Sequence, residues 1–492
     1  MSQYIISVDQ STQGTKGLLF DEKGELISRK DLPHRQIIDE RGYVEHDPKE
    51  IIENTYQVIR DLVTSSGIDA NEVAGLGISN QRETVLAWNK ETGEPVYNAI
   101  VWQCARGEAI CKELTQYAGV VKDRTGMNLS PYFSASKATW ILRNVPEAER
   151  LSTENKLCIG TIDAWLIYNF TEKKTFATDV SNAARTQLFN IHILDWDEEV
   201  CELFGIPMEA LPEVKDSNAL FGETTVGGFF AKPIPIHAAL GDSNGALFGQ
   251  GCLHAGMTKS TYGTGSSIMM NIGTTPAESK HGLVTSVAWG IDGEVSYVLE
   301  GNINYSAASI SWLKNDVQLI ENAGETEALA FAANPADRTY LVPAFTGLGA
   351  PYWDSNATGM YTGMTRTTGR AELVRAALDG IAYQITDIVS AMAEDTGVAL
   401  AELRVDGGPT RNKYLMQFQS DMTRIPIRVA SREELSGIGA AYMAGLALGV
   451  YDDAVFEVLG RTSYEPQMAE ERREELYRGW KVALKKALYQ PE

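Results

Sequence analysis

Ser11-Thr-Gln-Gly-Thr-Lys-Gly17 and Ser260-Thr-Tyr-Gly-Thr-Gly-Ser266 carry the same Ser-Thr-x-Gly-Thr pattern in the same register. The two stretches lie about half a chain length apart in a protein of 492 residues. Each is followed by an apolar run, Leu18–Phe20 in the first case and Ile268–Met270 in the second. Chance agreement between common turn residues is the alternative, but the half-chain spacing favours an internal duplication. The sequence therefore predicts two related α/β domains, each opening with a hairpin, that face each other across a cleft.

The rest of the chain alternates between strand and helix patterns. Tyr4–Val8 is a β-branched apolar run before the first turn, whereas Pro48–Ser65 and Glu372–Glu394 show apolar residues at helical spacing. Alternation of this kind predicts an α/β fold, here with two duplicated domains around a central cleft. We place these domains at residues 1–245 and 246–492.

Further helices are expected in the second half of the chain at Tyr414–Met422 and Ile438–Leu448. Two more have approximate bounds: the first runs from about Ser306 to Ile320, and the second covers about Glu470–Leu488. The second is so rich in charged residues that we interpret it as a solvated terminal helix and not as a partner site.

Length and charge narrow the class of protein. A chain of 492 residues is too long for one ordinary core, which again indicates two domains. The net charge of −22, from 65 acidic and 43 basic residues, argues against binding to nucleic acid or to an anionic membrane. No apolar run reaches the roughly 18 residues of a membrane-spanning helix. The residues after Met1 lack the basic region of a signal peptide.

The cysteine and histidine residues carry two more expectations. Five cysteines, an odd number without a C-x-x-C pair, indicate a reducing, cytoplasmic location. Six scattered histidines argue against a histidine-based metal cluster.

The two hairpin turns are the candidate sites for phosphate, because the chain has neither a Walker A loop nor a G-x-G-x-x-G fingerprint after a strand. Glycines let the backbone approach an anion, and backbone N–H groups with Ser and Thr hydroxyls supply donors. One turn from each domain would thus clamp a nucleotide, and Lys16 would add a positive charge. Asp9, at the end of the first strand, could reach phosphate through Mg²⁺. Taken alone, Asp9 is better interpreted as a cap of the turn.

Two more polar segments follow strand-like runs. Asp406-Gly-Gly-Pro-Thr-Arg-Asn412 offers Gly407 and Gly408 for close approach of a flat ligand, and Asn412 could contact a phosphate or a nucleoside. A plain strand-to-helix turn explains this spacing equally well. Asp242 lies near the middle of the chain, where it could accept a proton from a substrate hydroxyl, a step worth about 10²–10⁴-fold in rate.

With these segments placed, the chain resembles the FGGY family of carbohydrate kinases, within the actin/hexokinase/Hsp70 superfamily. The likeness covers essentially the whole chain and is closest to the glycerol kinases. The matching stretches are Gly42-Tyr-Val-Glu-His-Asp-Pro48, Gly77-Ile-Ser-Asn-Gln-Arg-Glu-Thr84, Asn98-Ala-Ile-Val-Trp-Gln103, Pro131-Tyr-Phe-Ser134, Val342–Asp354, Gly359–Asp379 and Leu415-Met-Gln-Phe-Gln-Ser-Asp421. The resemblance implies two ribonuclease-H-like domains, with ATP, Mg²⁺ and a small polyol meeting in the cleft. It also implies a homo-oligomer, either a dimer or a tetramer.

The resemblance carries over to individual residues. The polyol-side positions are Arg82, Glu83, Trp102, Tyr132, Asp242, Ser243 and Ser267. The nucleotide-side positions are Thr12, Gln13, Lys16, Thr264, Gly265, Ser311, Gly407, Gly408 and Asn412. Asp242 matches the general base, and Asp9 with Asp242 matches the metal position. Arginine can only donate hydrogen bonds and ionised carboxylates can only accept them, so the polar set would fix the orientation of a triol. The two aromatic rings would cover its C–H edge.

Several positions depart from the family pattern. Ser266-Ser267 stands where glycerol kinases usually have Cys-Phe, with the Phe against the substrate carbons, and Ser243 stands where they usually have Gln. On the nucleotide side, Ser11, Ala307 and Ser311 replace the usual Gly, Gly and Gln. The substrate-side changes put small hydroxyls in place of bulk, which would widen the pocket.

The sequence leaves several functions to compare. The leading prediction is ATP-dependent phosphorylation of a terminal hydroxyl of a small polyol, with glycerol converted to glycerol 3-phosphate. The first alternative is a kinase for a larger polyol or ketose, such as erythritol, ribitol, xylulose or ribulose. A catalytically inactive nucleotide-binding regulator is less favoured, because Asp9 and Asp242 are both present. An Hsp70-like or actin-like module that binds protein would lack the constellation of Asn80–Glu83 and Trp102.

Overall fold

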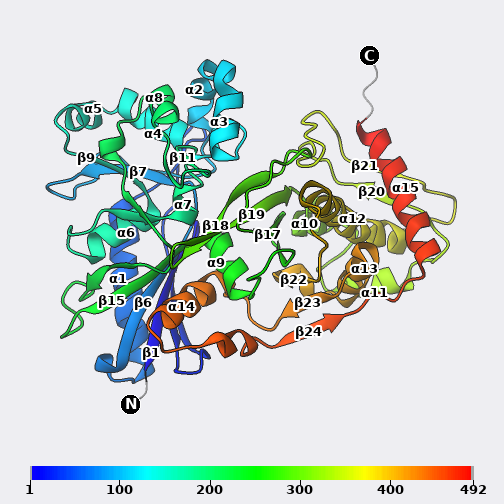
Figure 1. Ribbon diagram of the computed structural model, residues 1–492. Helices are drawn as coiled ribbons and strands as arrows, with labels where there is room; N and C mark the ends of the chain where they lie inside the picture. The colour runs from blue at the N-terminus through cyan, green and yellow to red at the C-terminus, as the bar shows by residue number, and fades with distance from the viewer. Residues whose placement is uncertain (1–2, 489–492) are drawn as a thin grey trace.

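The computed structural model describes residues 3–488, which form two lobes, each built on one large mixed β-sheet (Figure 1). The sheet of the first lobe has the order β14-β15-β6-β1-β2-β3. Its strands are β1 (Tyr4–Gln10), β2 (Gly14–Phe20), β3 (Leu26–Pro33), β6 (Val73–Asn80), β14 (Leu220–Thr224) and β15 (Ile234–Gly241). The sheet of the second lobe has the order β18-β19-β17-β16-β22-β23-β24. Its strands are β16 (Thr258–Tyr262), β17 (Ser266–Gly273), β18 (Val284–Ile291), β19 (Glu294–Ile303), β22 (Leu403–Asp406), β23 (Ile427–Ala430) and β24 (Arg461–Tyr464).

The two sheets share one topology. In the first, β1 runs antiparallel to β2 and parallel to β6, and β6 runs parallel to β15. In the second, β16 runs antiparallel to β17 and parallel to β22, and β22 runs parallel to β23. Beyond each hairpin, β3 pairs with β2 and β19 pairs with β17. The second sheet adds β18, which precedes β19 in the chain and pairs with its outer edge. This repetition confirms the predicted duplication, but the two Ser-Thr-x-Gly-Thr stretches are not in the same structural register. Ser11–Gln13 is the turn of the first hairpin, whereas Ser260–Tyr262 is the end of β16 and Gly263–Gly265 is the turn of the second hairpin.

Helices and smaller strands complete the lobes. The first lobe adds β4 (Ile37–Ile38), β5 (Val44–His46), β7 (Val85–Asn89), β8 (Ala99–Ile100), β9 (Leu157–Thr161), β10 (Ala177–Asp179), β11 (Phe189–Asn190), β12 (Asp195–Trp196), β13 (Glu213–Lys215), α1 (Pro48–Ser66), α2 (Glu108–Glu113), α3 (Ala118–Thr125), α4 (Ser134–Asn144), α5 (Pro146–Thr153), α6 (Ile162–Phe170), α7 (Val180–Ala183) and α8 (Glu198–Phe204). The second adds β20 (Tyr340–Val342), β21 (Met360–Thr362), α10 (Ala307–Asn315), α11 (Glu325–Ala332), α12 (Arg370–Thr396), α13 (Lys413–Thr423) and α15 (Glu470–Leu488). No helix within residues 3–488 is both long enough and apolar enough to span a bilayer.

Two helix predictions need correction. The helix expected over Ser306–Ile320 is only α10, because the N–H groups of Asp316 and Val317 both donate to the Trp312 carbonyl and end it. The predicted solvated helix α15 has one buried face, which includes Trp480. The indole N–H of Trp480 donates to Asp387 on α12 at 2.7 Å, so α15 is docked to the second lobe.

Two helices join the lobes through glycine contacts. α9 (Asp242–Gly249) follows the first sheet, and α14 (Leu435–Ala447) packs on α9 and on β1 and β6 although it comes late in the chain. A Cβ atom on Gly439 would lie 1.9 Å from the carbonyl oxygen of Gly245, so the helix backbones touch directly. The predicted division at residues 245 and 246 falls inside α9. We propose that this division holds for the sheets, with α14 shared between the lobes.

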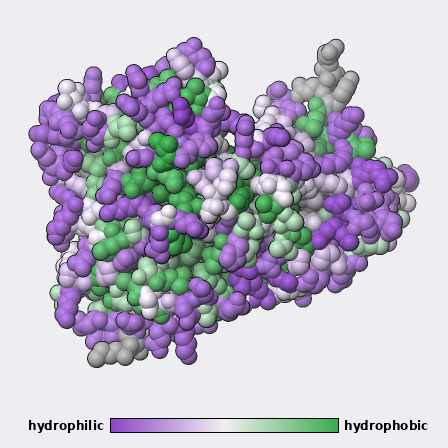
Figure 2. Space-filling view, viewed as in Figure 1, coloured by the Kyte–Doolittle hydropathy of each residue, from purple (hydrophilic) through white to green (hydrophobic). Residues whose placement is uncertain are grey.

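Hydropathy separates the rim of the molecule from its middle. In Figure 2 the outer rim is largely hydrophilic, and hydrophobic residues gather toward the middle of the same face. Inside the molecule, buried apolar residues of α9 and α14, such as Leu247 and Ile438, share one core cluster with residues of both large sheets, such as Leu18 and Val298. The joint between the lobes is therefore built as a packed core and not as a linker.

Replacing Gly439 by alanine is expected to lower the free energy of unfolding by about 1–3 kcal/mol, the usual cost of overpacking. Thermal or urea unfolding would measure it. Gly119→Ala is the matched control, because Gly119 lies in α3 and a Cβ there meets nothing within 4 Å. Alanine favours a helix by up to about 1 kcal/mol over glycine, so the control should be as stable as the parent or more stable. Equal losses in both variants would contradict close helix contact as the cause.

Candidate active site

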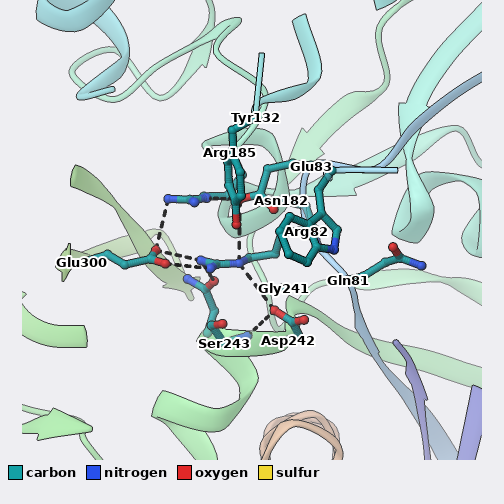
Figure 3. A network of polar contacts seen from close by, with 12 residues as sticks. Gln81, Arg82, Glu83, Tyr132, Asn182, Arg185, Gly241, Asp242, Ser243 and Glu300 are labelled. Atoms are coloured by element: carbon teal, nitrogen blue, oxygen red, sulfur yellow. Dashed lines mark hydrogen bonds and ion pairs between the residues drawn. The ribbon is translucent and has the colours of Figure 1, made fainter. Parts of the chain in front are cut away.

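A cluster of charged side chains lies where two parallel strands of the first sheet end. Arg82 and Glu83 follow β6, and Asp242 follows β15. Neighbouring parallel strands end at the same edge of a sheet, which is where ligands bind in open α/β folds. The Arg82 Nε lies 3.4 Å from Asp242 Oδ1 (Figure 3). The structure thus brings together three residues that the sequence assigned to the polyol.

Glu300 on β19 connects this cluster to the second lobe. Arg82 donates from both terminal nitrogens to the Glu300 carboxylate, at 3.0 and 2.9 Å (Figure 3). Arg185, which follows α7, donates to Glu83 Oε1 at 2.5 Å and lies 3.1 Å from Glu300 Oε2. Sequence reasoning missed Glu300 and Arg185. A lone acid inside the apolar run of β19 was a usable signal for Glu300, whereas Arg185 had no comparable signal.

The charges of the cluster balance without Asp242. Arg82, Arg185, Glu83 and Glu300 are each at most 6% exposed, and they give two positive and two negative charges. Burial by itself would raise the pKa of Glu300, but the guanidinium groups of Arg185 and Arg82 hold it well below its usual value. The side chain of Asp242 is 37% exposed and carries the one uncompensated negative charge of the group.

Trp102 and Tyr132, the two aromatic residues predicted to contact the polyol, lie beside this charged cluster. Trp102 follows β8 and Tyr132 lies just before α4, and their rings meet edge to face with centroids 5.4 Å apart. The Trp102 indole N–H donates to Thr12 Oγ1 at 2.9 Å. Thr12 belongs to the first hairpin turn, so this bond connects the predicted polyol side with the predicted nucleotide side. Burial raises the pKa of Tyr132 above its usual value, which keeps its hydroxyl protonated.

Asp9 and Lys16 face each other across the first hairpin. Asp9 accepts a hydrogen bond from Ser79 at 3.0 Å and lies 3.6 Å from the Lys16 Nζ. Lys16 also donates to Glu434 at 2.9 Å, so its charge is shared with the segment before α14. Burial raises the pKa of Asp9 to about 6, with Lys16 opposing the rise. Gln13 is exposed at the tip of the turn.

A cavity of about 390 Å³ opens between the lobes at Asp242. Among the predicted residues, its lining includes Asp242, Ser243, Gly265 and Ser267. Lys259 on β16 also lines it and was missed, although a lysine just before the second turn was a visible signal. Burial lowers the pKa of Lys259, and the nearby Asp406 opposes that change.

The second hairpin turn is fixed by the start of α10. The Thr264 carbonyl accepts from the N–H groups of Ser306 and Ala308, at 2.9 and 3.0 Å. A Cβ on Gly265 would lie 2.2 Å from the Ile303 carbonyl oxygen, so only glycine fits there. The turn is therefore held against α10, and its residues Gly263 and Gly265 line the cavity.

The remaining nucleotide-side residues lie along the edge of the second lobe. Gly407 has φ of 100° and would clash with the Tyr262 carbonyl if it carried a Cβ, whereas nothing lies within 4 Å of a Cβ on Gly408. Asn412 caps α13 by accepting from Leu415 N at 3.0 Å, and its amide donates to Thr326 at 3.0 Å. Its side chain is thus engaged in the fold. Ser311 is an exposed residue of α10, and neither it nor Asn412 lines the cavity at Asp242.

Two family models match the chain. The N-terminal domain of the FGGY family of carbohydrate kinases matches residues 4–249, and the C-terminal domain of the same family matches residues 258–448. The chain therefore belongs to the FGGY family of carbohydrate kinases, as its motifs predicted.

Individual relatives agree with this family. The chain is 47% identical to glycerol kinase 1 of Thermotoga maritima and 43% identical to the glycerol kinase of Bacillus subtilis, each over 99% of both chains. Among solved structures, it superposes on the Plasmodium falciparum glycerol kinase with ADP at a TM-score of 0.95, with 36% identity over 99% of both chains. The gluconate kinase of Lactobacillus acidophilus, at 22% identity over 99% of both chains and a TM-score of 0.88, shares the fold.

Proposed function

We propose that the protein transfers the γ-phosphoryl group of ATP to a terminal hydroxyl of glycerol. The observation that carries this proposal is the position of Asp242, which joins the polyol cluster through Arg82 and also lines the cavity between the lobes. Relatives named glycerol kinase at 43–47% identity over nearly the whole chain support the same activity.

The polar residues suit a triol. Each glycerol hydroxyl both donates and accepts, and the ionised carboxylates of Glu83 and Asp242 can accept from it. The donors of Arg82 are held in place by Glu300 and Asp242, so they are oriented before substrate arrives. The edge-to-face pair of Trp102 and Tyr132 offers an apolar surface for the carbon skeleton.

Proton removal is assigned to Asp242. Its carboxylate is held by Arg82 and by the N–H of Ser243 at 2.6 Å, which fixes its direction toward the cavity. It would accept the proton of the attacking hydroxyl as the phosphoryl group moves. Backbone N–H groups of both hairpin turns would stabilise charge on the phosphates. Closure of the lobes about α9 and α14 would exclude water.

The donor set at the first hairpin fits Mg²⁺. This ion usually takes one or two protein carboxylates together with water and substrate phosphates. Asp9 is buried with a raised pKa of about 6, so a cation beside it would favour its ionised form. When bound there, near Asp9 and Asp242, the ion would neutralise charge on the phosphates.

We also propose a cytoplasmic location, which the five free, buried cysteines support. We further propose that the protein is a dimer or a tetramer, which sedimentation would test.

ADP release with a panel of substrates tests the proposed reaction. Glycerol, erythritol, ribitol, xylulose and ribulose would each be supplied with ATP and Mg²⁺, and kcat/KM compared. We expect the highest value with glycerol. ATP hydrolysis that is independent of polyol would instead indicate a nucleotide module of another kind, and no turnover with any substrate would indicate a regulator.

A kinase for a larger polyol is the second candidate, and Ser267 favours it. Ser267 lines the cavity, and its buried Oγ has no hydrogen-bond partner among residues 3–488. Ser267→Phe is therefore expected to lower kcat/KM for ribitol relative to glycerol, because the ring would fill space that a longer chain needs. Ser267→Ala keeps the small volume and is the control. An unchanged ratio in the phenylalanine variant would exclude an enlarged pocket.

A further inference from the structure

Lys137 reaches back from helix α4 to the loop that carries Tyr132. Long side chains on a helix point toward its N-terminus, so a lysine in the first turns of α4 extends over residues 131–133. Its Nζ donates to the carbonyl oxygens of Pro131, Tyr132 and Phe133, at 2.9, 2.6 and 2.6 Å. An ammonium group has three N–H donors, so all of them are used by three consecutive peptide carbonyls.

This ammonium group is in an unfavourable place for a charge. Lys137 is 0% exposed, and it lies near the N-terminal end of α4, where the helix dipole disfavours a cation. The charged and titratable groups that act on it are Glu83, Arg106, Cys104 and Cys111. The three carbonyl bonds offset this cost, and their effect is to fix the path of the loop.

A second bond from the same turn of α4 holds the other polyol segment. Ser134 Oγ donates to the carbonyl oxygen of Glu83 at 2.9 Å. Phe133 lies under the guanidinium of Arg185, which is 5.2 Å from its ring centroid and bonded to Glu83. The first turn of α4 therefore fixes the Tyr132 loop and the Glu83 segment relative to each other.

We propose that Lys137 is a positioning residue for the polyol, which holds Tyr132 against Trp102 by binding the three carbonyls of the loop Pro131–Phe133. This inference rests on the proposed function and deepens it. Lys137 does not touch the substrate, and its effect passes through the Tyr132 ring. Loss of its bonds should weaken polyol binding and leave the nucleotide side, on the two hairpin turns, as it is.

Protonation of Lys137 offers an independent readout. Burial lowers its pKa to about 7, and the neutral amine has only two N–H donors for three carbonyls. Raising the pH through this value should therefore loosen the loop and raise the KM for glycerol. Stability should move the opposite way, because between pH of about 7 and about 10.5 the unfolded chain holds a proton that the folded protein has released.

Steady-state kinetics of Lys137→Met and Lys137→Arg test the proposal, with Lys112→Met as control because the Lys112 side chain on α2 is exposed. The methionine variant should raise the KM for glycerol by about tenfold, the factor for loss of one charge-assisted hydrogen bond, with an unchanged KM for ATP. Arginine should restore most of the affinity, and Lys112→Met should behave as the parent. An active methionine variant with a parental KM for glycerol overturns the proposal, whereas a parent without polyol-dependent ADP release overturns the proposed function instead.

A double-mutant cycle separates positioning from general destabilisation. If Lys137 acts through Tyr132, Lys137→Met combined with Tyr132→Ala should show the same KM for glycerol as Tyr132→Ala alone. If the effects of the two substitutions on the KM for glycerol add, Lys137 does not act through Tyr132. Should the methionine variant fail to fold, Lys137→Gln takes its place, because its shorter side chain with two N–H donors cannot satisfy three carbonyls. A folded, active glutamine variant with a parental KM for glycerol would contradict the proposal.

Discussion

Replacing Asp242 by asparagine is expected to lower polyol-dependent turnover by about 10²–10⁴-fold, the usual contribution of a positioned general base. The amide keeps the shape of the carboxylate but has no lone pair basic enough to take the hydroxyl proton. The surrounding charges should stay in place, because Arg82, Arg185, Glu83 and Glu300 balance one another without Asp242. Affinity for ATP should change little. ADP release would measure turnover, and a fluorescent nucleotide would measure binding.

Two outcomes would change the role given to Asp242. Near-parental turnover in Asp242→Asn would remove it from proton transfer. Loss of nucleotide binding would place it on the metal side of the site, together with Asp9. Asp61→Asn is the matched control, since Asp61 is an exposed residue of α1 whose side chain accepts from Gln57, a bond that the amide oxygen keeps.

The repeated turns could be predicted from sequence because the signal is local. The shared Ser-Thr-x-Gly-Thr pattern indicated the duplication, but it lies three positions earlier in the second hairpin than in the first. A hairpin turn needs small and hydroxyl-bearing residues within a few positions, so both turns could be located. The same holds for Asp242, which the chain places directly after β15. The end of α10 depends instead on one carbonyl, that of Trp312, taking two N–H donors. Residue spacing does not reveal such a choice.

Ion-pair partners that lie far apart in the sequence could not be predicted from any short sequence pattern. Glu300 is 218 positions from Arg82, and Arg185 is 102 positions from Glu83. Neither distance leaves a pattern in a single sequence. Asn412 likewise has a contact that no local pattern indicated, the bond to Thr326, in addition to its helix cap, and its role toward the nucleotide stays a prediction. Residue type and spacing restrict what a side chain can do, and packing decides what it does.

Glu300→Gln is expected to lower the free energy of unfolding by about 3–5 kcal/mol, the cost of removing one partner from a buried ion pair. The change keeps the shape of the side chain but leaves Arg82 and Arg185, both nearly fully buried, with Glu83 as their only enclosed counter-ion. Arg82 should then pair more tightly with Asp242, which would engage the carboxylate assigned to the substrate hydroxyl. Turnover should fall along with stability.

Urea unfolding followed by several probes would measure the stability change, because a two-lobed protein need not unfold in a single step. Glu147→Gln is the matched control: it removes an exposed partner of Arg150 on α5, where solvent already screens the pair, and stability should not change. Glu300→Gln could prove as stable as the control. In that case the cost of burying the charged groups cancels the attraction between Glu300 and the two arginines, and Glu300 serves only to orient Arg82. Reduced turnover at parental stability would be the signature of that case. A fall in both quantities would mean that one carboxylate holds the lobes together and also leaves Asp242 free to accept the proton.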